Sequence, residues 1–443
     1  MERELRMLTL IKNGYLIDPA SGREGRYDIL IDGEFISRVE ERIEEGPVRE
    51  EAERAEKELT LIDAGGRYVM PGFIDLHVHL REPGFEYKET IATGTMAAAA
   101  GGFTTICPMP NTRPATDSAA MIQNIISKAQ QEASVNVLPI GAVTLGQIGN
   151  ELVSIGELKA AGAVALSEDG KSVMNSALYM EAMRQAAYHR IPIFAHCEDK
   201  DLAGRGAVNA GSKAEELGLE GISNAVEDII TARDILMAKE SGAQLHLCHI
   251  STRDSARMLG LAKKEGLPVT GEVCPHHFVL SDEDIPGDDS NYKMNPPLRS
   301  PKDVQALKEA LKSGIIDVIA TDHAPHSDQE KAGSMAEAPF GIVGLETAFP
   351  LVLTELVETG YLTISQMVEK MSSNPAGVLG SDRGCIDVGR VADIVIADPG
   401  AEYCIDKGFS CSKGRNTPFH GRKVKGRIET TLVAGKIVYS FQK

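Results

Sequence analysis

Three features that would mark particular classes of protein are missing from this sequence. It has no run of about 18 apolar residues, so no segment is expected to cross a membrane as a helix. Residues 1–6 are too charged to open a secretory signal, and we therefore expect a cytoplasmic protein. Positive charge is scarce, because 46 Lys and Arg stand against 64 Asp and Glu and give a formal net charge of -18. This balance disfavours nucleic acid and anionic membranes as partners and leaves small molecules or proteins.

The sequence also lacks any CxxC pair. Its seven cysteines are odd in number and lie mostly inside apolar runs, so free buried thiols are expected. With 42% hydrophobic and 25% charged residues, the chain has the composition of a globular protein with a sizeable core. A length of 443 residues allows one large barrel and a smaller second domain.

Both ends of the chain read as β-structure. Short alternating strands are expected at residues 8–11, 15–17 and 28–31, with Asn13-Gly14 and Asp32-Gly33 as hairpin turns. Similar strands recur at residues 392–397, 426–433 and 435–439. An acidic run at 40–58 is expected to be a solvated loop or surface face. The two ends therefore predict one β-sandwich domain formed by residues 1–66 and 381–443, with a second domain inserted between them.

Residues 67–380 alternate short apolar strands with helical stretches, as a parallel α/β fold does. Helices are expected at residues 121–132, 177–189, 227–241 and 302–312. Eight strands can be counted, and their expected ends are residues 77–79, 108–111, 141–144, 167–170, 195–198, 248–251, 273–276 and 320–323. The pattern predicts a (β/α)8 TIM barrel, in which the carboxyl ends of all strands meet on one face.

The first of these strand ends carries the clearest chemical signal. With a period of two, Phe73, Asp75, His77 and His79 point to one face of the strand, and the apolar residues between them point to the other. Two adjacent imidazoles are suited to binding a metal ion such as zinc. Two ordinary buried histidines are the alternative interpretation.

The convergence of the strand ends favours metal binding over two ordinary buried histidines. Strands one, four, five, six and eight together offer His77, His79, Asp169, His196, His249 and Asp322. Four histidines and two carboxylates exceed the needs of one tetrahedral zinc and suit two ions sharing a bridging carboxylate, so one or two Zn2+ are expected per chain. His246, His276 and His277 are left out, the first because of its strand parity and the others because ordinary hydrogen bonding explains them.

Several motifs together resemble the amidohydrolase superfamily and, within it, the dihydroorotases. They are residues 75–81, 109–112, 195–198, 248–251, 320–326 and 416–419. The resemblance covers nearly the whole chain. It implies reversible hydrolysis of the cyclic amide of dihydroorotate to N-carbamoyl-L-aspartate in pyrimidine synthesis, with the six residues above as metal ligands and Asp322 also as catalytic acid/base.

The substrate side is consistent with this resemblance. Arg81 offers a planar fork for the carboxylate of dihydroorotate, and a surface salt bridge is its alternative role. Asn111 and Asn295 can supply amide groups to the ring. The resemblance adds His326, and the polar loop from His326 to Phe340 and Gly341 is a candidate for substrate contacts or gating, or else an idle surface loop.

Two runners-up are weighed against this assignment. Hydantoinases and allantoinases of the superfamily typically carry a carboxylated lysine at strand four, whereas residues 163–170 contain no lysine and resemble the bacterial-type dihydroorotases with an aspartate there. Non-catalytic dihydroorotase-like scaffold proteins would lack ligands, and none is missing here. A homo-oligomer is expected, and the resemblance implies association with aspartate carbamoyltransferase for some of the family.

Overall fold

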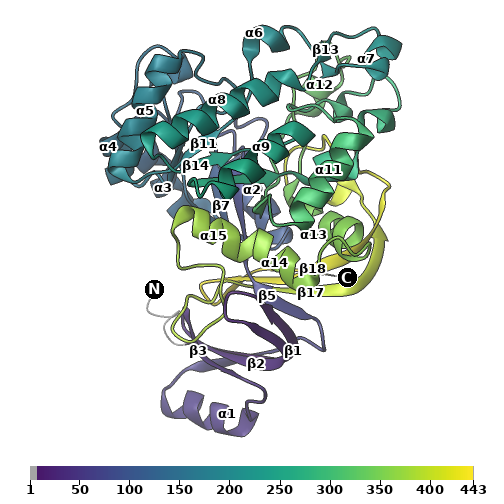
Figure 1. Cartoon of the computed structure of the whole chain (residues 1–443). Coiled ribbons are helices and arrows are strands. Elements are labelled where there is room, and N and C mark those ends of the chain that lie inside the picture. The colour runs from purple at the N-terminus through teal and green to yellow at the C-terminus, as the bar shows by residue number, and fades with distance from the viewer. Residues whose placement is uncertain (1–6, 443) are drawn as a thin grey trace.

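The computed structural model describes residues 7–442, and it combines a sheet made from both ends of the chain with parallel sheets made from its middle. Figure 1 shows the helices from the middle of the chain gathered around the parallel strands in the upper part of the molecule, with the sheet of the termini below them and one further helix at the bottom. Residues 1–6, on which the expectation about a secretory signal rests, lie outside the described residues, as does Lys443.

The termini form one continuous eight-stranded sheet. Its order is β19-β18-β17-β5-β1-β2-β3, and β4 also pairs with β1. The two ends of the chain join where β5 lies between β1 and β17, with Val69 opposite Ile396. The strands are β1 (Met7–Asp18), β2 (Arg23–Asp32), β3 (Phe35–Glu40), β4 (Glu58–Asp63), β5 (Tyr68–Pro71), β17 (Ile394–Cys404), β18 (Lys423–Val433) and β19 (Lys436–Ser440).

One of the two predicted hairpin turns is wrong. Asp32 and Gly33 do turn the chain from β2 into β3, where Asp32 pairs with Phe35. Asn13 and Gly14 instead lie inside β1, whose register against β2 shifts between Ile11 and Gly14. Asn13 has a φ of 58°, which asparagine tolerates better than most residues, so this dipeptide makes a bulge in one long strand.

The acidic run forms a helix, so the loop prediction for residues 40–58 is wrong in part. Helix α1 (Glu45–Arg54) turns its acidic residues outward and buries Val48 and Ala52. These two side chains pack with Leu8 and Leu10 of β1. The run is therefore a surface face, the other outcome predicted for it, and it covers one side of the terminal sheet.

The middle of the chain forms parallel sheets, which confirms the predicted α/β class. Six strands follow the order β16-β15-β14-β11-β10-β9 and three follow the order β6-β7-β8. All eight predicted strands are present, together with the short β8. Their bounds are β6 (Phe73–Val78), β7 (Phe103–Pro108), β8 (Asn136–Val137), β9 (Ile140–Ala142), β10 (Ala165–Ser167), β11 (Ile193–Ala195), β14 (Leu245–Leu247), β15 (Val269–Val273) and β16 (Val318–Ile319), and a separate parallel pair consists of β12 (Val208–Asn209) and β13 (Gly221–Ile222).

Strict alternation along β6 does not hold. Ile74 and Leu76 pack with apolar side chains from strands of both parallel sheets, whereas Phe73 and Val78 belong to another cluster. The register of β6 against β7 shifts between Phe73 and Ile74 and again between Asp75 and Val78. The first shift comes from an extra residue in β7 and leaves β6 unaffected. The second comes from an extra residue in β6 between Asp75 and Val78, so Val78 and the later side chains move to the other face, because the side-chain period of a strand is two.

The four predicted crossover helices are confirmed to within two residues at each end. They are α3 (Ala119–Glu132), α5 (Ser176–His189), α8 (Ala225–Ser241) and α11 (Pro301–Lys312). The other helices are α2 (Ile91–Ala100), α4 (Ile155–Ala161), α6 (Lys200–Ala203), α7 (Ser212–Leu217), α9 (Arg253–Lys264), α10 (Pro275–Val279), α12 (Asp328–Lys331), α13 (Ala348–Val352), α14 (Ile364–Val368) and α15 (Asn374–Leu379). In the described part of the chain, no helix combines the length and the apolar character needed to cross a membrane.

The terminal sheet and the parallel strands are joined at Gly72, which separates β5 from β6. The terminal sheet thus extends through Pro71, five residues beyond the expected boundary at residue 66. A Cβ atom at Gly72 would lie 2.2 Å from Oγ1 and 2.3 Å from Cγ2 of the buried Thr104 in β7. The close approach of the Thr104 side chain to the backbone at this point therefore requires glycine.

We expect Gly72→Ala to lower the free energy of unfolding by about 1–3 kcal/mol, because Thr104 cannot move out of a packed strand without strain. The matched control is Gly377→Ala in α15, where a Cβ meets nothing within 4 Å and alanine favours the helix. Thermal melting followed by circular dichroism compares the two. Equal melting temperatures for both variants would contradict the packing argument.

Candidate active site

The six side chains predicted to bind metal meet at one place. Each lies within or just after the carboxyl end of a parallel strand, and each is at most 6% exposed. Ligand atoms of His77, Asp169 and His249 lie within 4.8 Å of one another, and so do those of His77, His79 and Asp322. The two groups share His77, so the six side chains form one continuous cluster.

Asp169 stands at the centre of this cluster. Its Oδ1 lies 3.3 Å from Nε2 of His77, 3.6 Å from Nδ1 of His196 and 3.9 Å from Nε2 of His249. Its Oδ2 lies 3.7 Å from Nε2 of His79. One carboxylate thus faces all four imidazoles, with its two oxygens turned to different rings, as a bridging ligand requires.

Hydrogen bonds on the outer side of His77 direct its lone pair into the cluster. Nδ1 lies 2.9 Å from Oε1 of Glu272, a carboxylate oxygen that can only accept, so Nδ1 carries the proton. Nε2 then faces Asp169 at 3.3 Å and Asp322 at 3.5 Å. This atom is buried and has no hydrogen-bond partner among the described residues. A metal ion between the ring and the carboxylates would satisfy it.

His79 is oriented in the same way by Asn111. The Nδ2 group of Asn111 donates to Oδ2 of Asp169 at 3.0 Å, which fixes the amide and leaves its Oδ1 2.9 Å from Nδ1 of His79. Nδ1 therefore donates, and Nε2 is the bare nitrogen that faces Oδ1 of Asp322 at 3.0 Å. Asn111, predicted as a substrate contact, has both ends of its amide engaged with this cluster.

His196 is held by a third pair of outer residues. Its Nε2 lies 3.2 Å from Oε2 of Glu198, whose Oε1 accepts from Nδ2 of Asn295 at 2.9 Å. The other ring nitrogen, Nδ1, is turned inward, 2.8 Å from Nε2 of His249. Asn295, another predicted substrate contact, therefore also supports a ligand side chain. All four imidazoles present a nitrogen to the same small volume.

The charges of the cluster call for a cation. Burial raises the pKa of Asp169, but His77 and the neighbouring imidazoles more than offset this, and the pKa lies well below its usual range. Burial likewise raises the pKa of Asp322, while His77 and His79 bring it below its usual value. The same carboxylates raise the pKa of His77 well above normal although burial opposes this. Two buried anions thus favour positive charge between them, from protons or from metal.

Three residues of the site have left-handed backbone conformations. Arg81, His249 and Asp322 have φ angles of 62°, 32° and 47°, a region that side chains other than glycine rarely adopt. Such strain persists where the surrounding structure fixes a side chain for a purpose. It supports a functional role for these three positions.

Arg81 and His326 lie side by side next to the carboxylates. Arg81 donates through Nε to the carbonyl oxygen of Pro325 at 3.2 Å, and its Nη2 is 3.4 Å from Nε2 of His326. Nε2 of His326 also lies 2.8 Å from the carbonyl oxygen of Phe340 and must carry the proton, because that oxygen only accepts. Nδ1 of His326 therefore accepts from Nζ of Lys88 at 3.2 Å.

The loop between His326 and Gly341 is anchored on both sides. Lys331 is buried and donates through Nζ to the carbonyl oxygens of Ser290, Lys293 and Pro339 at 2.7–3.2 Å. Gly341 has a φ of 133°, and a Cβ there would lie 2.7 Å from the Cβ of Ala324. These contacts give the loop one defined path beside the cluster.

The C-terminal part of the chain also reaches this region. The side chain of Asn416 accepts from the backbone N–H of His326 at 3.0 Å and donates to the carbonyl oxygens of Ala324 and Gly341 at 3.1 and 2.9 Å. It thus ties both ends of the loop together. Asn416 was noticed only as part of a motif, because its partners lie some 75–92 positions away in the sequence.

The sequence interpretation missed Glu272, Glu198 and Lys88. A signal for Glu272 did exist, because it is a lone charged residue in the otherwise uncharged strand β15. Glu272 also accounts for His246, whose Nε2 lies 3.0 Å from Oε2 of Glu272 while its Nδ1 lies 2.8 Å from Oγ1 of Thr270. His246 lies outside the ligand cluster and, like His77, is held by Glu272.

The whole chain is similar to curated dihydroorotases. Residues 66–255 match the family described as Dihydro-orotase-like. The chain is 47% identical over 437 residues to the dihydroorotase of Caldanaerobacter subterraneus subsp. tengcongensis, covering 99% of this chain and 98% of that protein. It is 48% identical over 433 residues to the dihydroorotase of Bacillus licheniformis, with 98% of both chains covered.

Solved structures with the same architecture include hydantoinases. The L-hydantoinase (dihydropyrimidinase) of Arthrobacter aurescens has a TM-score of 0.84 and 26% identity, with 98% of this chain and 96% of that chain covered. The D-hydantoinase (dihydropyrimidinase) of Thermus sp. has a TM-score of 0.83 and 28% identity, with 98% and 97% covered. The fold is thus shared more widely than the sequence.

Glu272→Gln tests whether the outer hydrogen bonds prepare the cluster for metal. We expect metal affinity to fall about 10–100-fold, because an amide no longer forces the proton of His77 onto Nδ1. Competition with a chelator, read by elemental analysis, measures the affinity. Glu265→Gln at the exposed end of α9 is the control. Unchanged affinity in a folded Glu272→Gln protein would contradict the orienting role.

Proposed function

This chain belongs to the dihydroorotase family, and from that premise we propose that the cluster around Asp169 is the centre that opens the cyclic amide of dihydroorotate reversibly to N-carbamoyl-L-aspartate. The enzyme is a metal-dependent cyclic amidohydrolase of pyrimidine synthesis. The observation that carries the site assignment is the unpartnered Nε2 of His77, buried between two carboxylates and next to three further imidazoles.

We propose His77, His79, Asp169, His196, His249 and Asp322 as the metal ligands. The donors are imidazole nitrogens and carboxylate oxygens, which suit Zn2+, and their number suits one or two ions per chain. When bound, the metal supplies an activated water and polarises the ring carbonyl. Glu272, Asn111 and Glu198 would keep the ligand rings in the required tautomers.

The chain's own groups would perform the remaining steps. Asp322 would accept the proton of the attacking water and deliver it to the departing ring nitrogen, which suits its place at the edge of the cluster, 3.0 Å from His79. Arg81 would bind the substrate carboxylate, and His326 would join it if its Nε2–H turned from the carbonyl oxygen of Phe340 to the substrate, with the backbone at Phe340 and Gly341 beside them. Asn111 and Asn295 remain predicted to contact the substrate in addition to their supporting bonds.

We further propose that the two parallel sheets close into one (β/α)8 barrel. Val78 of β6 forms a parallel bridge with His323, just beyond β16, and the backbone N–H of His79 donates to the carbonyl oxygen of His323 at 2.8 Å. The terminal strands would then be the β-sandwich domain, formed by residues 1–71 and 381–443. Cytoplasmic location, a homo-oligomeric state and association with aspartate carbamoyltransferase stay predictions.

The hydantoinase-type alternative shares the fold but is less similar in sequence. The hydantoinases named above are 26–28% identical to this chain, against 47–48% for the dihydroorotases. Asp169 lies where a carboxylated lysine would be expected in a hydantoinase, and it already faces all four imidazoles. A scaffold role is disfavoured because the ligand set is complete.

Substrate choice tests the assignment directly. We expect purified protein to open dihydroorotate and to leave hydantoin, dihydrouracil and allantoin nearly untouched, because only the first carries a carboxylate for Arg81. Arg81→Met should raise KM at least about tenfold, the equivalent of one lost charged contact, and leave metal content intact. Arg113→Met, at an exposed arginine, is the control. Preference for a ring without a carboxylate would refute the proposal.

Asp322→Asn tests the proton transfer. We expect both hydrolysis and ring closure to fall by at least about a hundredfold, the usual contribution of a general acid or base, while the protein stays folded and keeps part of its metal. Rates in the two directions and elemental analysis are measured on the same preparation. Substantial activity in either direction would show that Asp322 is a ligand only, and His326 would be the next residue to test.

A further inference from the structure

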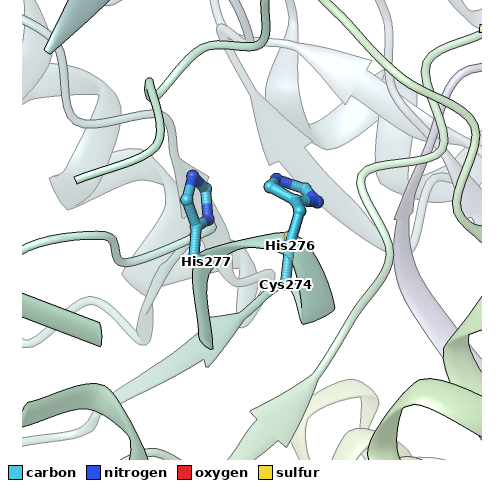
Figure 2. A group of neighbouring side chains, drawn as sticks. All are labelled: Cys274, His276 and His277. Carbon is cyan, nitrogen blue, oxygen red and sulfur yellow. The ribbon is translucent and has the colours of Figure 1, made fainter. Parts of the chain in front are cut away.

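A second cluster of possible metal ligands lies at the end of β15. Cys274 follows this strand, and His276 and His277 stand on the first turn of α10. Figure 2 shows the two rings side by side on the same turn, and their centroids are 4.2 Å apart. All three residues are at most 2% exposed, and one ligand atom from each lies within 4.8 Å of the others.

Two ring nitrogens of this cluster are left without partners. Nε2 of His277 lies 3.0 Å from the carbonyl oxygen of Pro296 and must donate to it, so Nδ1 of the neutral ring bears a lone pair. Neither this Nδ1 nor Nε2 of His276 has a hydrogen-bond partner among the described residues, although both are buried. The ordinary hydrogen bonding expected for these histidines thus accounts for only one of the two rings.

Buried nitrogens without hydrogen-bond partners, next to a thiol, are suited to binding a metal ion. Leaving a buried nitrogen without a hydrogen-bond partner is unfavourable, and a bound ion would remove this cost. One sulfur and two imidazole nitrogens form a softer donor set than the nitrogen and oxygen cluster around Asp169, and such a set selects thiophilic ions. Neither His276 nor His277 belongs to the ligand groups of that cluster.

We propose that Cys274, His276 and His277 form a separate binding site for a thiophilic divalent cation of the Zn2+ class. Three protein donors leave one tetrahedral position for water. The thiol gives up its proton to solvent as the ion binds, since the thiolate is the ligand. The site rests on its own residues and does not depend on the reaction assigned to the neighbouring centre.

X-ray absorption at the zinc edge distinguishes this site from the cluster around Asp169. The full-length protein is loaded with Zn2+, and a sulfur shell at about 2.3 Å is expected besides nitrogen and oxygen at about 2.0–2.1 Å. Since the proposed ligands around Asp169 include no sulfur, the sulfur shell reports a cysteine. A spectrum of nitrogen and oxygen alone would overturn the proposal, and a water between the two rings would then satisfy them. The assignment of the reaction would be untouched.

Two cysteine variants identify the source of the sulfur. Cys274→Ser should abolish the sulfur shell and lower the zinc content by about one ion per chain. His277→Ala should lower the zinc content by the same amount. Cys248→Ser is the matched control, because Cys248 is also buried and lies near His77 and Glu272. It should keep the sulfur shell. Loss of the shell in Cys248→Ser, or its persistence in Cys274→Ser, would overturn the assignment.

Discussion

Burial of two carboxylates among four imidazoles is the constraint on which the site depends. Asp169 and Asp322 are held away from water, where an unpaired negative charge costs several kcal/mol. The four imidazoles point ring nitrogens toward the two carboxylates, so that a proton or a cation held between them offsets that cost. Glu272, Asn111 and Glu198 hold the outer ring nitrogens of His77, His79 and His196 by hydrogen bonds. A cation bound among these groups would complete the arrangement, since without one the inward-facing groups are poorly paired.

The convergence of the six side chains could be predicted because it follows from the topology of the strands. Strands of a parallel α/β protein bring their carboxyl ends together, so His77 and Asp322 could be placed side by side although 245 positions separate them. What sequence does not contain is the side of each ring that carries the proton. For His77 the position of the proton is set by Glu272, and only the three-dimensional structure shows that these two residues are in contact.

Local irregularity explains where sequence patterns failed. Alternation along β6 is broken by one extra residue between Asp75 and Val78, and Asn13-Gly14 makes a bulge inside a strand instead of a hairpin. In both cases the tertiary pairing of strands overrode a dipeptide or a period that was interpreted locally. The acidic run at 40–58 gave a helix because Val48 and Ala52 supply a narrow apolar stripe that charge counting ignores.

Asn416 closes a loop of the substrate side from the far end of the chain, and this has a consequence for biosynthesis. During translation the parallel strands and their ligands emerge well before Asn416, so the metal cluster can be assembled while its neighbouring loop still lacks the amide that joins Ala324, His326 and Gly341. The growing chain therefore contains all six side chains of the cluster before the amide that fixes the neighbouring loop has been made. A chain that ended before Asn416 would keep all six side chains of the cluster and lack the amide that joins the two ends of the loop.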